Sequence, residues 1–140
     1  MINFPFILNV DQEPEEKFHL QAFNGKYVCT DNHVVIANRD NASLWETYSI
    51  IRMPNNKCAI RAYDNLFLSA DLGHLNEVIA NKEKISDLEA FTMIKLDGNH
   101  VAFKAANGKY LSVDEKSLQV FAKGDSIGKQ EKFEVKANAN

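Results

Sequence analysis

The segment AFNGKY at residues 22–27 returns as AYDNLF at residues 62–67 and as AANGKY at residues 105–110, at offsets of 40 and 43 residues. Two further sets recur in the same order, namely alanines that follow β-branched runs (Ala37, Ala80 and Ala122) and Glu-x-aromatic motifs (beginning at Glu46, Glu89 and Glu131). Self-similarity at a fixed period of this length is the mark of a repeat architecture. We therefore predict three like units at about 17–56, 57–99 and 100–136, with a leader at 1–16 and a tail at 137–140.

Within each unit, apolar residues alternate with polar ones, which is typical of strands with one face on a core. The first strand of each unit would place three residues inward: Phe18, Leu20 and Ala22; Cys58, Ile60 and Ala62; Val101, Phe103 and Ala105. Second strands are expected at 27–30, 67–70 and 110–113, third strands at 34–38, 77–81 and 118–123, and fourth strands at 45–51, 88–94 and 131–136. Asn-Gly, Asp-Asn and Asn-Gly pairs join the first two strands, and these residue types suit a type I′ turn.

Twelve short strands in three units are compatible with a propeller, a solenoid or a closed threefold barrel. Propellers usually have four or more blades. A solenoid needs polar capping units at its ends, whereas the first and third units here are equally hydrophobic. Closure on a threefold axis removes exposed strand edges, so we predict an all-β fold, a β-trefoil of three four-stranded repeats with pseudo-threefold symmetry.

Two segments carry a resemblance to a known family. The sequences AIRAYDNLFLSA (59–70) and AFKAANGKYLSV (102–113), each followed by a Glu-x-Phe motif, resemble the repeats of fascin-like β-trefoils, which include the hisactophilin-type actin-binding proteins. The resemblance covers residues 17–136. It implies a six-stranded barrel capped by three hairpins, and a non-enzymatic module that binds or crosslinks actin filaments.

Composition and charge argue against membrane spanning, secretion and nucleic-acid binding. The chain has 140 residues, 45% of them hydrophobic and 25% charged, and no run approaches the ~20 apolar residues of a membrane helix. The beginning lacks the features of a signal peptide, and the two cysteines suit reduced thiols, so a cytoplasmic location is expected. Residues 1–16 carry a charge of −4 and the rest +1, a balance that argues against nucleic-acid binding, which favours a basic face.

No constellation for catalysis or metal binding stands out. The repeated Glu46, Glu89 and Glu131 are equivalent, whereas acid/base catalysis needs carboxylates in different environments. They are expected to accept backbone N–H groups at the entrance to a strand. The four histidines (His19, His33, His74 and His100) lack the close spacing of a zinc site. We predict no enzyme activity, no cofactor and no metal.

The resemblance to fascin-like proteins directs attention to cations near the hairpins. Five of them are candidate contacts for the acidic surface of an actin filament: Lys26, Arg39, Lys82, Lys109 and Lys123. Simple solvation of these side chains is the alternative.

A carbohydrate-binding, lectin-like module is the alternative function. Phe23 and Tyr63 occupy one repeat position that faces outward, where aromatic rings stack on sugars or protein partners; the third unit has Ala106 there. The aspartates that end the second strands are candidate acceptors for sugar hydroxyls: Asp31, Asp71 and Asp114. The Gln-x-Trp motif of ricin-type lectins is missing, since Ser43 stands two places before Trp45.

The leader has its own pattern. If it is extended, Ile2, Phe4, Phe6, Leu8 and Val10 share one face. Such a face is expected to pack on the open end of the barrel or on a second copy, so the protein is predicted to be a monomer or a leader-mediated dimer.

Overall fold

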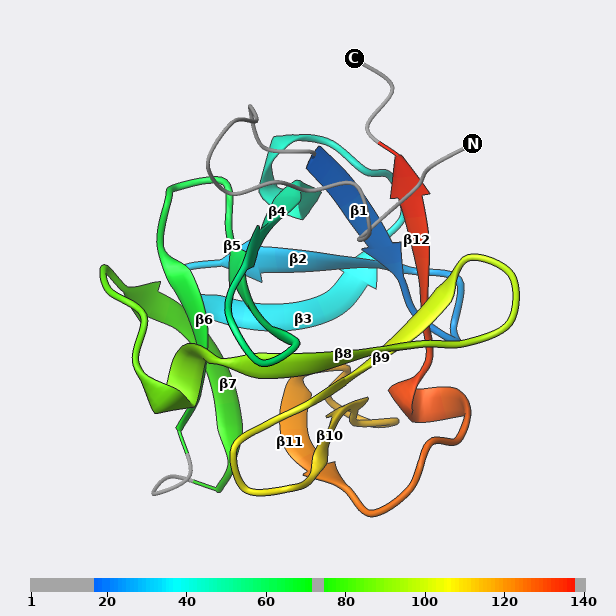
Figure 1. Ribbon diagram of the computed structural model, residues 1–140. Coiled ribbons are helices and arrows are strands. Elements are labelled where there is room, and N and C mark those ends of the chain that lie inside the picture. Colours follow the sequence, from blue (N-terminus) through cyan, green and yellow to red (C-terminus); the bar gives the residue numbers. More distant parts are fainter. Residues whose placement is uncertain (1–16, 72–74, 138–140) are drawn as a thin grey trace.

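The computed structural model describes residues 17–71 and 75–137, which form twelve strands and three short 3-10 helices (Figure 1). The predicted leader, His74 and most of the tail lie outside these residues. The order of three strands, one 3-10 helix and one strand occurs three times. The bounds are β1 Lys17–Gln21, β2 Tyr27–Asp31, β3 Val34–Arg39, η1 Leu44–Glu46 and β4 Tyr48–Arg52; β5 Lys57–Arg61, β6 Phe67–Asp71, β7 Glu77–Lys82, η2 Asp87–Glu89 and β8 Phe91–Lys95; β9 His100–Lys104, β10 Tyr110–Val113, β11 Val120–Gly124, η3 Lys129–Glu131 and β12 Phe133–Ala137.

Six strands pair in a closed ring. β1 is antiparallel to β4, β4 to β5, β5 to β8, β8 to β9, β9 to β12, and β12 to β1. The first and fourth strands of each unit thus form a barrel, as the resemblance implied. In Figure 1, β1 and β12 lie side by side although they are far apart in the sequence.

The other six strands form the hairpins β2–β3, β6–β7 and β10–β11, which meet one another across one end of the barrel. The repeated alanines lie where they meet, and all three are fully buried. Each donates its N–H to a carbonyl in the turn of a neighbouring hairpin: Ala37 to Leu118 (2.8 Å), Ala80 to His33 (2.9 Å) and Ala122 to Asn76 (2.7 Å). A larger side chain at these positions would force the hairpins apart, which explains why alanine recurs.

The core confirms the inward positions predicted for the first strands. All nine residues are buried, from Phe18 and Ile60 at 0% exposure to Ala22 at 7%. Tyr48, Phe91 and Phe133 from the fourth strands complete the barrel interior. One continuous apolar cluster therefore fills the barrel and the base of the hairpins.

The predicted type I′ turns between the first two strands are wrong. Only Gly25, Asn65 and Gly108 have positive φ there (80°, 72° and 81°), and the Gly25 N–H donates to the Ala22 carbonyl at 3.0 Å. This is the pattern of a three-residue loop that ends in a left-handed residue. The Asn24 side chain stabilises it, because its Oδ1 accepts from the Lys26 N–H at 3.0 Å.

The fourth strands begin later than predicted. The segments expected to open them form η1, η2 and η3 instead, and β4, β8 and β12 begin at Tyr48, Phe91 and Phe133. The cause is the repeated glutamate, whose backbone N–H closes a turn onto the carbonyl three residues earlier, at 3.2 Å for Glu46 and Ser43. Its side chain bonds to the amide of that same residue, so the turn is locked twice.

Candidate functional site

The three repeated glutamates have the structural role that we predicted. They are 2–8% exposed, and each accepts a backbone N–H: Ser43 to Glu46 (2.7 Å), Ser86 to Glu89 (2.7 Å) and Gly128 to Glu131 (2.8 Å). The Ser112 hydroxyl also donates to Glu131 at 2.6 Å. These carboxylates are fully engaged in holding the entrance to the fourth strand.

Burial and hydrogen bonds shift the pKa values of Glu89 and of the two cysteines. Burial acts to raise the pKa of Glu89, but hydrogen bonds from the Ser86 hydroxyl and the Ser86 amide stabilise the charged form, and the pKa lies below its ordinary value. Burial, together with a hydrogen bond to Glu46, raises the pKa of the Cys29 thiol to about 12. Burial raises the pKa of Cys58 to about 12 as well. Both cysteines are free and buried, so both are neutral thiols at pH 7, which are poor nucleophiles.

Four of the five predicted cations are bonded to carboxylates. Lys26 pairs with Asp40 and Lys109 with Asp125. The remaining pairs are Arg39 with Asp31 and Lys123 with Asp114, both at 2.7 Å. Lys82 lies at the exposed end of β7, and its charge helps to hold the Glu89 carboxylate ionised.

The predicted aspartates differ from one another. Asp114 accepts the N–H groups of Lys116 (3.1 Å) and Ser117 (2.9 Å), so it closes its own turn. Its bond with Lys123, followed by those from Ser117, holds its pKa well below the usual range. Asp31 instead accepts from Arg39, because a two-residue turn with positive φ at Asn32 and His33 follows it. The side chain of Asp71 lies outside the described residues.

Trp45 and Arg39 lie between Tyr63 and Asp31, so the four side chains form one cluster. The Trp45 and Tyr63 rings are stacked, with centroids 6.1 Å apart and planes at 21°. The Arg39 guanidinium lies 5.6 Å from the Trp45 ring centroid and donates to Asp31. Trp45 is 41% exposed. These four residues, which we call the tryptophan site, combine aromatic faces with a guanidinium and a carboxylate that both reach solvent.

Sequence reasoning missed Trp45 as a site residue. We had placed it in a strand, whereas it lies in η1, where the backbone turns its ring outward. The repeat did hold a signal. Leu88 and Gln130 occupy the same position in the other units, and a position that accepts glutamine is not part of the core.

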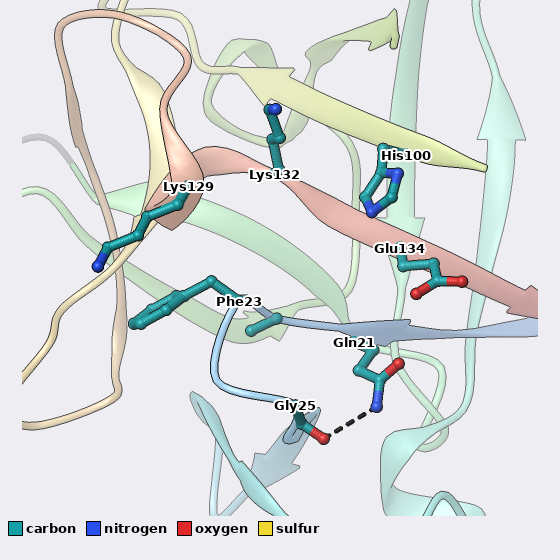
Figure 2. Close-up of a pocket in the computed structure, with 8 residues that line it drawn as sticks. Gln21, Phe23, Gly25, His100, Lys129, Lys132 and Glu134 are labelled. Carbon is teal, nitrogen blue, oxygen red and sulfur yellow. Dashed lines mark hydrogen bonds between the residues drawn. The ribbon is translucent and has the colours of Figure 1, made fainter. Parts of the chain in front are cut away.

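Phe23 lines a hollow of about 400 Å³, which Figure 2 shows. Its ring packs partly on the core, and the Lys129 ammonium lies 5.5 Å from the ring centroid. The hollow is lined by Gln21, Ala22, Phe23, Gly25, His100, Lys129, Lys132 and Glu134. The structure therefore separates the two predicted aromatic residues into two different sites.

Residues 17–71 and 75–137 contain no group of three or more histidine, cysteine, aspartate or glutamate side chains able to hold a metal ion. The same residues include no helix of the length and apolarity needed to cross a membrane.

Comparison with solved structures defines the class of protein. The designed threefold-symmetric protein ThreeFoil matches with a TM-score of 0.77 and 15% identity, over 87% of this chain and 99% of that one. The BEL β-trefoil matches with a TM-score of 0.75 and 15% identity, over 98% and 100%. The Rhizoctonia solani agglutinin matches with a TM-score of 0.73 and 10% identity, over 91% and 98%. The chain thus has the all-β fold of the β-trefoil proteins.

Its family follows from sequence. The chain belongs to the domain family of unknown function DUF7910, which matches residues 19–132. The curated proteins include no sequence match. The fold is also similar to part of an exo-β-1,3-galactanase from Clostridium thermocellum, with a TM-score of 0.74 and 11% identity, over 88% of this chain and 30% of the galactanase.

Proposed function

We propose that this protein is a non-enzymatic carbohydrate-binding module and that the tryptophan site holds the sugar. The observation that carries the proposal is the stacked pair of Trp45, which is exposed, and Tyr63, which is partly buried, beside the Arg39–Asp31 pair. Ligand sites typically combine aromatic surface with a few polar groups that fix orientation, and this surface provides both.

The chemistry of each side chain suits a neutral sugar. The C–H face of a pyranose ring packs on an indole or phenol ring, which has a negative face and a large apolar area. The Asp31 carboxylate accepts hydroxyl protons and the Arg39 guanidinium donates to hydroxyl oxygens. The Asn38 side chain accepts from the Arg39 Nε at 3.1 Å and so helps to fix the guanidinium.

The similar structures support the choice of ligand class. An agglutinin and a galactanase are among them, and both names refer to carbohydrate-related activities. Their identity to this chain is 10–11%, so they direct the choice of probes and identify no particular sugar.

A glycan array, followed by calorimetry with the best ligand, tests the proposal. We expect Trp45→Ala and Tyr63→Ala to lose binding and Tyr63→Phe, which keeps the ring, to retain it. Phe121→Ala is the matched control, because it removes another partly buried aromatic side chain, on β11. Undiminished binding by Trp45→Ala would refute the assignment of the site.

Actin binding is the second candidate, and it draws on the resemblance to fascin-like trefoils and on the hairpin cations. Four of these cations, Lys26, Arg39, Lys109 and Lys123, each pair with a carboxylate of this chain, which a filament would have to replace. Co-sedimentation with actin filaments at low and moderate salt distinguishes the two functions. Binding through cations weakens as salt rises, and reversing the charges of Lys26, Lys82 and Lys109 abolishes it. Binding to a neutral sugar is unaffected by salt.

The remaining expectations belong to the same proposal. A module that only binds needs no cofactor, and we propose that it acts without one in the cytoplasm. Its oligomeric state, a monomer or a leader-mediated dimer, stays a prediction that sedimentation of the full chain tests.

A further inference from the structure

The aromatic residues of the first two units face different chemical partners. Phe23 and Tyr63 share one repeat position. In both cases the aromatic ring lies next to the 3-10 helix of a neighbouring unit. Tyr63 stacks on Trp45 of η1, whereas Phe23 lies under the ammonium group of Lys129 from η3. The neighbouring 3-10 helix therefore presents an indole ring to Tyr63 and an ammonium group to Phe23.

Three polar side chains lie in a row along one side of the hollow around Phe23. Gln21 of β1 lies opposite Glu134 of β12, and Glu134 lies opposite His100 of β9. The three side chains thus come from three adjacent strands, and Figure 2 shows them next to one another. The Gln21 amide is held in place by donating to the Gly25 carbonyl at 2.9 Å. An amide, a carboxylate and an imidazole in one row offer both donors and acceptors for hydroxyl groups.

Two lysines give this hollow its charge. Lys129 and Lys132 line it together with one glutamate, and both lysines are exposed. Lys129 is paired with Glu115 at 3.5 Å, and both side chains are more than half exposed, so this pair is weak and easily exchanged. At the repeat positions of Lys129 and Lys132, the first unit, which contributes Trp45, has the uncharged Leu44 and Thr47. The extra cations therefore distinguish this hollow from the tryptophan site.

We propose that the hollow around Phe23 binds an anionic sugar, one with a carboxylate on its pyranose ring. This inference rests on the proposed carbohydrate-binding function and adds a second site of different specificity. The Phe23 ring packs on the sugar, Lys132 and Lys129 bind the carboxylate, and the Gln21–Glu134–His100 row binds hydroxyls. A volume of about 400 Å³ is within the ~300–1,000 Å³ that is typical of ligand pockets.

Titration of the full chain with D-glucuronate and with D-glucose, followed by NMR at the Gly25 amide, tests this inference. We expect glucuronate to shift the Gly25 signal at lower concentration than glucose does. Lys132→Gln removes a charge-assisted hydrogen bond and should weaken glucuronate binding by about tenfold while leaving glucose unchanged. Lys84→Gln, which removes an exposed lysine of the second unit, is the matched control and should change neither.

Two outcomes would overturn the inference: equal binding of the two sugars, or a preference for glucuronate that Lys132→Gln leaves intact. Phe23→Ala copies the alanine of the third unit and should abolish binding of both sugars at Gly25. If neutral glycans still bind through Trp45 while glucuronate leaves Gly25 unmoved, only this inference fails. If neither site responds to any sugar, the proposed function fails with it.

Discussion

Glu131→Ala removes a carboxylate that holds two parts of the third unit together. Glu131 is 8% exposed and accepts the Ser112 hydroxyl at 2.6 Å and the Gly128 N–H at 2.8 Å. A hydrogen bond to a charged group contributes ~1.5–3 kcal/mol, and loss of a bond that caps a helical turn costs about 1 kcal/mol. We therefore expect Glu131→Ala to lower the free energy of unfolding by about 3 kcal/mol, a large share of the ~5–15 kcal/mol typical of a domain.

Urea unfolding, followed by circular dichroism, measures this change. A double-mutant cycle with Ser112→Ala isolates the buried bond, and its coupling energy should be about 1.5–3 kcal/mol. Glu115→Ala is the control, because Glu115 is a largely exposed carboxylate of the same unit, and it should change stability by less than about 0.5 kcal/mol. A loss below about 1 kcal/mol for Glu131→Ala, or no coupling to Ser112, would refute a structural role for the repeated glutamates.

Three further predictions concern the same framework. Gly124→Ala should cost ~1–3 kcal/mol by overpacking, because an added Cβ would lie 2.8 Å from the Glu131 Cγ; an unchanged urea midpoint would contradict this. The folded-state pKa of Glu89 lies below its unfolded value, so its contribution is present above about pH 4.3 and is lost as the pH falls through the folded pKa. The stability difference between the wild type and Glu89→Ala should therefore shrink at low pH, and a constant difference would count against the carboxylate bonds. Raised pKa values at Cys29 and Cys58 predict that a thiol reagent labels neither at pH 7 until urea unfolds the chain; fast labelling of the native protein would be inconsistent with buried neutral thiols.

The repeat in the sequence was sufficient to predict the number and order of the strands and the residues of the core. Alternation at Phe18, Leu20 and Ala22 reports burial directly, because side chains in a strand alternate between two faces. The repeated alanines also reported a real constraint, although their role at the meeting point of the hairpins needed the structure. Spacing alone shows that a position is restricted and does not show what restricts it.

Local geometry was harder to predict. The pair Asn24-Gly25 suits two kinds of hairpin turn, and the choice depends on hydrogen bonds such as the one from the Asn24 side chain to the Ala37 carbonyl at 3.2 Å, 13 residues away. The 3-10 helices depend on a carboxylate that bonds to the backbone amide three residues earlier. The repeat predicted that these glutamates accept backbone N–H groups, but it did not predict the helical turn that the bond closes. Missing η1 led directly to missing Trp45.

The predicted cations illustrate a different limit. Their side chains lie in or next to the hairpin strands, but a sequence does not show which carboxylate will face them. Lys26 and Asp40 are 14 residues apart, and Lys109 and Asp125 are 16 apart. The register of the hairpins β2–β3 and β10–β11 brings these partners together, because it places Tyr27 opposite Arg39 and Tyr110 opposite Gly124.

The most direct test of the central claim uses the single tryptophan of the chain. Because Trp45 is the only indole, its fluorescence reports the tryptophan site alone during titration with the best glycan from the array. The account predicts a saturable change in intensity or wavelength that is insensitive to salt and is lost in Tyr63→Ala. Saturable glycan binding by calorimetry with no change in Trp45 fluorescence would place the sugar elsewhere and contradict the account.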